Sequence, residues 1–146
     1  MMSEQKHAKY FIMADKPNVT FPSFRPQMDT KLFRRIVHLD ADVIPETDFY
    51  SEAMWIMPGE EFKKGITKIE AHKHSWGEMI GFYGYNYDNI YDLGAEIEFT
   101  IDGKTYNITE SFASYIPAGI EHGPLIIKNV KRPIMHFTAG PTLKYE

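Results

Sequence analysis

Several features on which other protein classes depend are missing from this sequence. There is no cysteine among its 146 residues, so disulfides, thiolate metal sites and cysteine nucleophiles are excluded, and any bound metal needs nitrogen and oxygen ligands. The basic residues are spread along a chain of net charge −4 and do not form the clusters that bind nucleic acid or anionic lipid. We therefore expect neither nucleic acid nor a membrane among the partners.

The N-terminal region also lacks a continuous apolar run. Charged residues are scattered through residues 1–20, a pattern that resembles neither a secretory signal nor a membrane span. A cytoplasmic protein is the expectation. Residues 1–30 contain three prolines and few periodic apolar positions, which disfavours a helix. The sequence therefore predicts an extended arm over residues 1–30 and a single β-barrel domain over residues 31–146.

Helical periodicity is absent as well, whereas strand patterns recur along the chain. No stretch of ten residues places its apolar side chains three to four positions apart, as an amphipathic helix would. Short runs of alternating apolar and polar residues are separated by turn residues. In the clearest case, residues 96–109, Asp102 and Gly103 lie between two such runs and can adopt the positive φ angles of a hairpin turn. The prediction is an all-β fold, an antiparallel β-barrel or sandwich.

Three histidines and a glutamate have the spacing of a metal site. His72 and His74 lie two residues apart on a predicted strand, so both imidazoles would point to one face and could share an ion. Glu78 follows after Ser-Trp-Gly, where a turn or bulge could return its carboxylate to that side. His122 ends the run 117–122, whose proline and glycine favour a turn. This donor set suits one divalent transition metal ion such as Fe, Mn, Ni, Co or Zn.

The two motifs H-x-H-x3-E and P-x-G-x2-H together resemble the paired motifs of the cupin superfamily, over roughly residues 65 to 138. The resemblance implies a jelly roll, also described as a double-stranded β-helix, with His72, His74, Glu78 and His122 as ligands of one ion. Departures from the usual glycine and asparagine positions of the motifs concern turn geometry and leave the four ligand positions intact.

The resemblance leaves the reaction open. Metal cupins of this size include dioxygenases, isomerases, decarboxylases and lyases that act on small molecules, and the fold does not choose among them. An octahedral ion with four protein ligands has positions left for water, dioxygen or substrate. The first hypothesis is a metal-dependent enzyme with a small-molecule substrate. The alternatives are a cupin that binds a small molecule without converting it and a metal-free structural cupin.

Glu70 is the candidate for proton transfer. It shares the predicted strand face of His72 and His74, so its carboxylate could enter the barrel as a general acid or base, or as an acceptor for a ligand's hydrogen bond. The other interpretation is a solvated charge at the barrel mouth. The three histidines outside the motifs are expected to be ordinary hydrogen-bonded residues: His7, His38 and His136.

Two expectations concern the surface. Exposed sheet edges invite pairing and cupins are commonly dimeric, so we expect a homodimer in which the arm and the strand from Arg35 to Leu39 cover an edge of the neighbour's sheet. The tyrosine-rich residues 83–92 are predicted to form a long loop. Loops at barrel mouths often select ligands.

Overall fold

The computed structural model describes residues 6–146, and most of its regular structure is β-strand. Helical structure in that range consists of two short 3-10 turns, η2 (Ala8–Tyr10) and η3 (Glu60–Lys63). No helix among the described residues is long and apolar enough to cross a membrane. The predicted all-β class is therefore confirmed.

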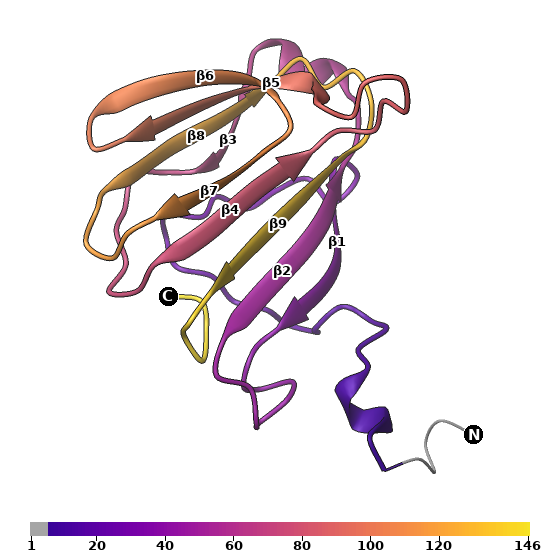
Figure 1. Cartoon of the computed structure of the whole chain (residues 1–146), viewed down its shortest axis with the longest axis vertical. Helices are drawn as coiled ribbons and strands as arrows, with labels where there is room; N and C mark the ends of the chain where they lie inside the picture. Colours follow the sequence, from indigo (N-terminus) through magenta and orange to yellow (C-terminus); the bar gives the residue numbers. More distant parts are fainter. Residues whose placement is uncertain (1–5) are drawn as a thin grey trace.

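The strands form two antiparallel sheets that face each other (Figure 1). The five-stranded sheet, in the order β1-β2-β9-β4-β7, contains Phe33–Leu39, Tyr50–Ile56, Ile134–Gly140, Glu78–Tyr83 and Phe112–Ile116. The four-stranded sheet, in the order β3-β8-β5-β6, contains Ile66–Ile69, His122–Lys128, Asp92–Ile101 and Lys104–Glu110. After β2 the chain passes from one sheet to the other at most connections, which gives the predicted jelly roll.

The hairpin between β5 and β6 forms where the sequence predicts it. Asp102 has φ +50° and Gly103 has φ +79°, the left-handed pair that a two-residue hairpin turn requires because it matches the twist of the strands. Phe99 pairs with Tyr106 on the two sides of this turn.

The space between the sheets has an apolar end and a polar end. Along β4, the inward side chains change from Glu78 to Ile80 and then to Phe82, all of them buried. β2 shows the same order, from the polar Tyr50 to the apolar Ile56. Apolar residues of both sheets form one core cluster, which supplies most of the stabilisation. The fold thus concentrates its polar interior at one end of the barrel.

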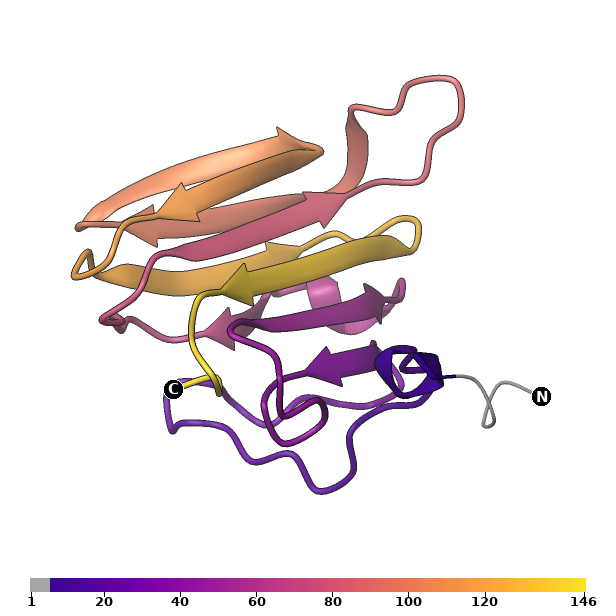
Figure 2. The same ribbon diagram turned by 60° about the horizontal axis from the view of Figure 1, so that its bottom comes forward.

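Two segments without strands cover the polar end. The chain before β1 runs along this side of the barrel, close to the C-terminal segment 141–146 (Figure 2). Ion pairs tie it to the barrel, Lys16 to Asp40 at 2.7 Å and Arg25 to Glu52 at 3.0 Å. Residues 1–5 of the predicted arm lie outside the described residues.

Candidate metal centre

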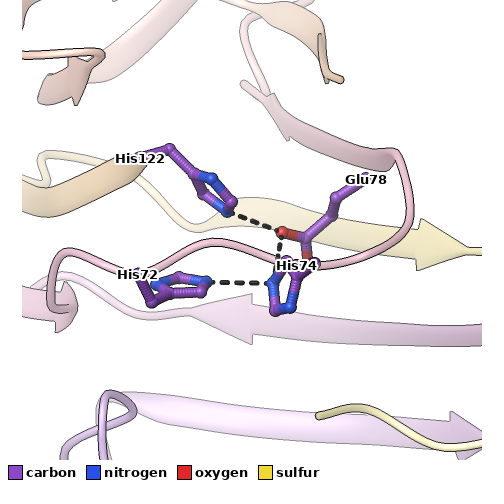
Figure 3. Close-up of side chains that lie close together, drawn as sticks. All are labelled: His72, His74, Glu78 and His122. Carbon is purple, nitrogen blue, oxygen red and sulfur yellow. Dashed lines mark hydrogen bonds and ion pairs between the residues drawn. The ribbon is translucent and has the colours of Figure 1, made fainter. Parts of the chain in front are cut away.

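Four side chains converge at the polar end of the barrel (Figure 3). They are the predicted set: His72 and His74 lie on the connection between β3 and β4, Glu78 begins β4, and His122 begins β8. Each offers one ligand atom, and these atoms all lie within 4.8 Å of one another. His74, Glu78 and His122 are buried, whereas His72 is half-buried at the rim. The structure therefore holds a His/Glu group that could bind a metal.

The local structure around the histidines differs from the prediction. β3 ends at Ile69, so His72 and His74 do not lie on a regular strand. His72 instead forms an isolated bridge with His122, in which each amide donates to the other's carbonyl at 2.9 and 2.8 Å. The amide of Gly119 donates to the carbonyl of His74 at 2.8 Å, and its φ of +81° explains the glycine in the second motif. Backbone pairing therefore joins the segments that carry the two motifs.

Each imidazole is oriented by a main-chain oxygen. The Nδ1 atoms of His72, His122 and His74 contact the main-chain oxygens of Glu70, Ile120 and Glu146 at 2.7, 3.0 and 2.6 Å. A carbonyl oxygen only accepts, so each Nδ1 must carry the proton. The Nε2 lone pair of each neutral ring is then free, as in histidines that ligate metals through Nε2.

The free lone pairs meet at separations that fit one cation. Nε2 of His72 lies 3.0 Å from Nε2 of His74, and burial lowers the pKa of His72 to about 4, so the His72 ring is neutral at neutral pH and its Nε2 has no proton to donate. Glu78 Oε1 lies 3.4 Å from Nε2 of His74 and 3.2 Å from Nε2 of His122. Two ligands bound at about 2.1 Å lie about 3.0 Å apart at right angles and about 3.4 Å apart at tetrahedral angles. The residues present therefore fit a divalent transition metal.

The carboxylate of Glu78 is held in its charged form. Burial alone would raise the pKa of Glu78, but the close imidazoles of His122 and His74 and the hydrogen bond from Tyr50 outweigh it and lower the pKa to about 2. The Tyr50 hydroxyl donates to Oε2 at 2.8 Å, which leaves Oε1 directed at the imidazoles. Burial raises the pKa of Tyr50, so this hydroxyl remains a donor at neutral pH.

Aromatic rings fix two of the imidazoles from the outside. Phe24, on the segment before β1, stacks on His72 at a centroid distance of 3.6 Å. Trp76 stacks on His74 at 4.0 Å, and Tyr145 packs edge-on against His74. The sequence motifs mark none of these contacts as functional, because Phe24 and Tyr145 reach the site only through tertiary folding.

Glu70 does not join the cluster. Its carboxylate is exposed, which agrees with the interpretation of Glu70 as a solvated charge and not with a carboxylate inside the barrel. The register of β3 against β8 shifts between Thr67 and Ile69, so Lys68 is the extra residue of a β-bulge. A one-residue bulge reverses the in/out alternation that follows it, which turns Glu70 outward and leaves Lys68 buried inside. The catalytic role assigned to Glu70 stays a prediction.

A small charged cavity adjoins the cluster. It has a volume of about 10 Å³, room for about one water molecule. Glu78 lines it together with Arg25, Glu52, Lys68 and Tyr145. Apart from Arg25 and Tyr145, the residues that line it lie on strands. The residues around the candidate centre are therefore strongly polar, and they are closed off by the two segments that cover the barrel end.

The histidines outside the motifs remain apart from the cluster. His38 is buried, with Nδ1 2.7 Å from Glu52 and Nε2 3.2 Å from Asp40. His136 is buried and donates from Nδ1 to the carbonyl of Gly81 at 3.0 Å. His7 is exposed.

The tyrosine-rich loop lies away from the candidate centre. Residues 84–91 connect β4 to β5, and Glu78 begins β4 at the opposite end of that strand. Figure 2 shows the loop projecting from the end of the molecule remote from the C-terminus. This position gives the loop no direct contact with a ligand at the cluster.

Comparison with known proteins identifies the fold. No family model and no curated protein matches the sequence. Two structures of oxalate oxidase, one in complex with the substrate analogue glycolate, are similar to the chain with TM-scores of 0.55 and 0.56 and 13% identity; they match 100% of this chain, which spans 66% of theirs. The protein has the cupin fold. A cupin protein from Bacteroides fragilis is also similar, with a TM-score of 0.47 and 16% identity over 84% of this chain and 86% of that one.

The cupin fold positions the four convergent side chains. In this protein, both motifs predicted from the sequence lie at the polar end of the barrel, where the connection after β3 meets the start of β8. At such low identity the likeness concerns architecture alone, so the chemistry has to be argued from the residues of the site.

Proposed function

We propose that this cupin is a metal-dependent enzyme that acts on a small polar molecule at the end of its barrel. The observation that carries the proposal is the set of three imidazoles whose Nδ1 protons are used by main-chain oxygens. Their Nε2 atoms and Glu78 Oε1 are thereby directed at one point. A bound divalent ion would act there as a Lewis acid, polarising an oxygen of the substrate.

The protein's own residues supply orientation and exclusion of water. Tyr50 holds the Glu78 carboxylate, and Phe24 and Trp76 hold the rings of His72 and His74. Enclosing the site strengthens every electrostatic interaction in it. For proton transfer we retain Glu70, whose exposed carboxylate lies at the rim, two residues before His72. The oxalate oxidases that share the fold act on a small oxygen-rich molecule, which supports the choice of substrate size.

The proposal is tested by removing and restoring the metal. Small hydroxy-acids, diketones, sugars and phenols are screened for turnover with protein purified without a metal-affinity tag. We expect turnover of one class to be lost after chelation and restored by one transition metal. Restored metal without turnover of any compound would contradict the enzyme proposal.

A second candidate function is the binding of a small molecule without conversion. It is favoured by the closed barrel end, where the cavity beside Glu78 measures about 10 Å³. A compound that raises the melting temperature of the metal-loaded protein but is recovered unchanged after prolonged incubation would support this alternative.

A further inference from the structure

Lys68 is a buried lysine that the metal cluster does not use. Its residue exposure is 3%, and lysines are almost never so buried without a partner. Among residues 6–146 its ammonium group makes no hydrogen bond within 3.5 Å and no ion pair within 4.0 Å. It lies inside because it is the extra residue of the bulge in β3, and bulges often re-aim a side chain next to an active site.

The charged side chains around Lys68 already interact with other groups. The cavity that Lys68 lines also contains Arg25, Glu52 and Glu78. Glu52 is bound by Arg25 at 3.0 Å and by His38 at 2.7 Å, and Glu78 belongs to the metal cluster. The charges of Glu52 and Glu78 act on Lys68, but among the described residues neither carboxylate forms an ion pair with its ammonium group. A divalent cation at the cluster would add further positive charge to the same space.

We propose that Lys68 is the specificity-determining anchor for a carboxylate group of the small molecule bound at the candidate metal centre. This inference rests on the proposed function and names the class of ligand: a small carboxylic acid that also offers an oxygen to the metal. A carboxylate would give the ammonium group the charge-assisted hydrogen bond it lacks, and a neutral isostere would not.

The protonation of Lys68 agrees with this role. Burial, followed by the positive charge of Arg25, lowers the pKa of Lys68 to about 7. A carboxylate bound against the group would favour the charged form and raise the pKa again.

Tyr145 is the side chain that gives the ligand room. The cavity holds about one water molecule, at about 10 Å³, so a carboxylate enters only if part of its wall moves. Tyr145 lies on the segment 141–146, beyond the last strand, and its anchors to the barrel include the hydrogen bond from Ala41 to the main-chain oxygen of Leu143. Arg25, the other lining residue outside the strands, is tied to Glu52 by an ion pair. We assign the movement to Tyr145, whose ring packs against Tyr50, His74 and Trp76.

The test compares glycolate with glycolamide, which has the same hydroxyl group and nearly the same size but no charge. Affinities are measured by calorimetry for wild type, Lys68→Met, Lys68→Arg and the control Lys128→Met. Lys128 lies on the neighbouring strand β8 and pairs with Glu98 outside the site. Metal content and melting temperature are recorded for each sample, so the state of the metal centre is known independently.

We expect wild type to bind glycolate at least about tenfold more tightly than glycolamide, the range of a hydrogen bond to a charged group. Lys68→Met should lose about tenfold or more for glycolate with glycolamide unchanged, Lys68→Arg should keep part of the preference, and Lys128→Met should match wild type. Equal losses for both probes in Lys68→Met would indicate a structural role and overturn the inference. The inference would also be overturned if wild type with bound metal showed no preference for glycolate, or if Lys68→Met kept the preference.

A different set of results would contradict the proposed function. Wild type that binds no transition metal would contradict the metal-dependent enzyme. If this metal-free protein still prefers glycolate, and Lys68→Met abolishes the preference, the role of Lys68 as a carboxylate anchor is supported independently of the metal.

Discussion

At the scale of single residues, the candidate centre depends on main-chain oxygens as much as on its ligands. His72 is held by the carbonyl of Glu70 on one side and by the ring of Phe24 on another. Glu70 therefore orients His72 through its main-chain carbonyl, which any residue type at this position would provide. Its carboxylate is left free for the role in proton transfer that we retain for it.

Glu70→Gln separates these two contributions. The variant should keep the metal content of wild type, because the carbonyl that orients His72 is unchanged. Turnover on the same preparation should fall by about 10²–10⁴-fold if the carboxylate is the general acid or base. Unchanged turnover would make Glu70 a surface charge, and a loss of metal would contradict the backbone role.

At the scale of elements, local signals in the sequence predict part of the fold and most of the cluster. The hairpin at Asp102 and Gly103 depends on local φ angles, which the residue types reveal. The side chains that the two motifs predict as ligands do converge. The bulge in β3 has no comparable signature, and the alternation that placed Glu70 inside applied equally to Lys68, two residues earlier. Only the pairing of β3 with β8 decides which of the two points inward.

The segment before β1 depends on tertiary contacts in the same way. It carries both Phe24 and Arg25 to the site, and its charged anchor is the pair of Arg25 with Glu52 on β2, whose side chains are 8% and 3% exposed. Burial alone would raise the pKa of Glu52, but the hydrogen bond from His38 and the charge of Arg25 outweigh it and lower the pKa far below the usual range. Nothing in the sequence near Arg25 identifies this partner.

Glu52→Gln tests that anchor. Removing the carboxylate leaves a buried guanidinium group uncompensated, so the free energy of unfolding should fall by about 3 kcal/mol. The control Glu98→Gln breaks a partly exposed pair with Lys128, 31% exposed on each side, and should cost less than about 1 kcal/mol. Urea titrations of metal-free protein measure both. Equal costs for the two variants would show that the Arg25 pair does not anchor the segment.

At the scale of the whole molecule, the polar interior makes stability depend on pH. His136 is buried on β9 against Phe82, and burial, followed by the charge of Lys68, lowers its pKa to about 3. The unfolded chain takes up a proton here near pH 6.5 and the folded chain does not. The stabilising contribution of neutral His136 is therefore complete above about pH 6.5 and is lost as the pH falls toward 3.

His136→Asn should remove this dependence while keeping a donor for the carbonyl of Gly81. Between pH 7 and pH 5, metal-free wild type should lose about 2 kcal/mol of unfolding free energy more than the variant does. The exposed His7 provides the control, since His7→Asn should follow wild type. Identical pH profiles for wild type and His136→Asn would contradict the assignment.

The predicted homodimer also belongs to this scale. β1 is an edge strand of the five-stranded sheet, and Ile36 on it is 40% exposed, beside Trp55 and Tyr85. The preceding segment is bound to its own barrel through Lys16 and Arg25, so the edge of β1 is the part of the predicted interface that remains open. Exposed edges of this kind favour pairing with a second copy.

Light scattering measures the oligomeric state and so tests the predicted dimer. We expect twice the mass of one chain at micromolar concentration. Ile36→Lys should shift the protein toward monomer, because a charge on an edge strand opposes pairing. Ile90→Lys in the tyrosine-rich loop, where Ile90 is 64% exposed, should leave the mass unchanged. A monomer mass for wild type would reject the dimer.

The central claim is that His72, His74, Glu78 and His122 hold one divalent transition metal ion. Elemental analysis of protein purified without a metal-affinity tag tests it most directly. The account predicts about one equivalent per chain in wild type and in the control His7→Asn. In His122→Ala and His74→Ala the content should be at most about a tenth of this, because loss of one imidazole weakens a site with no spare ligand. Wild type without metal after incubation with these ions, or His122→Ala with wild-type content, would contradict it.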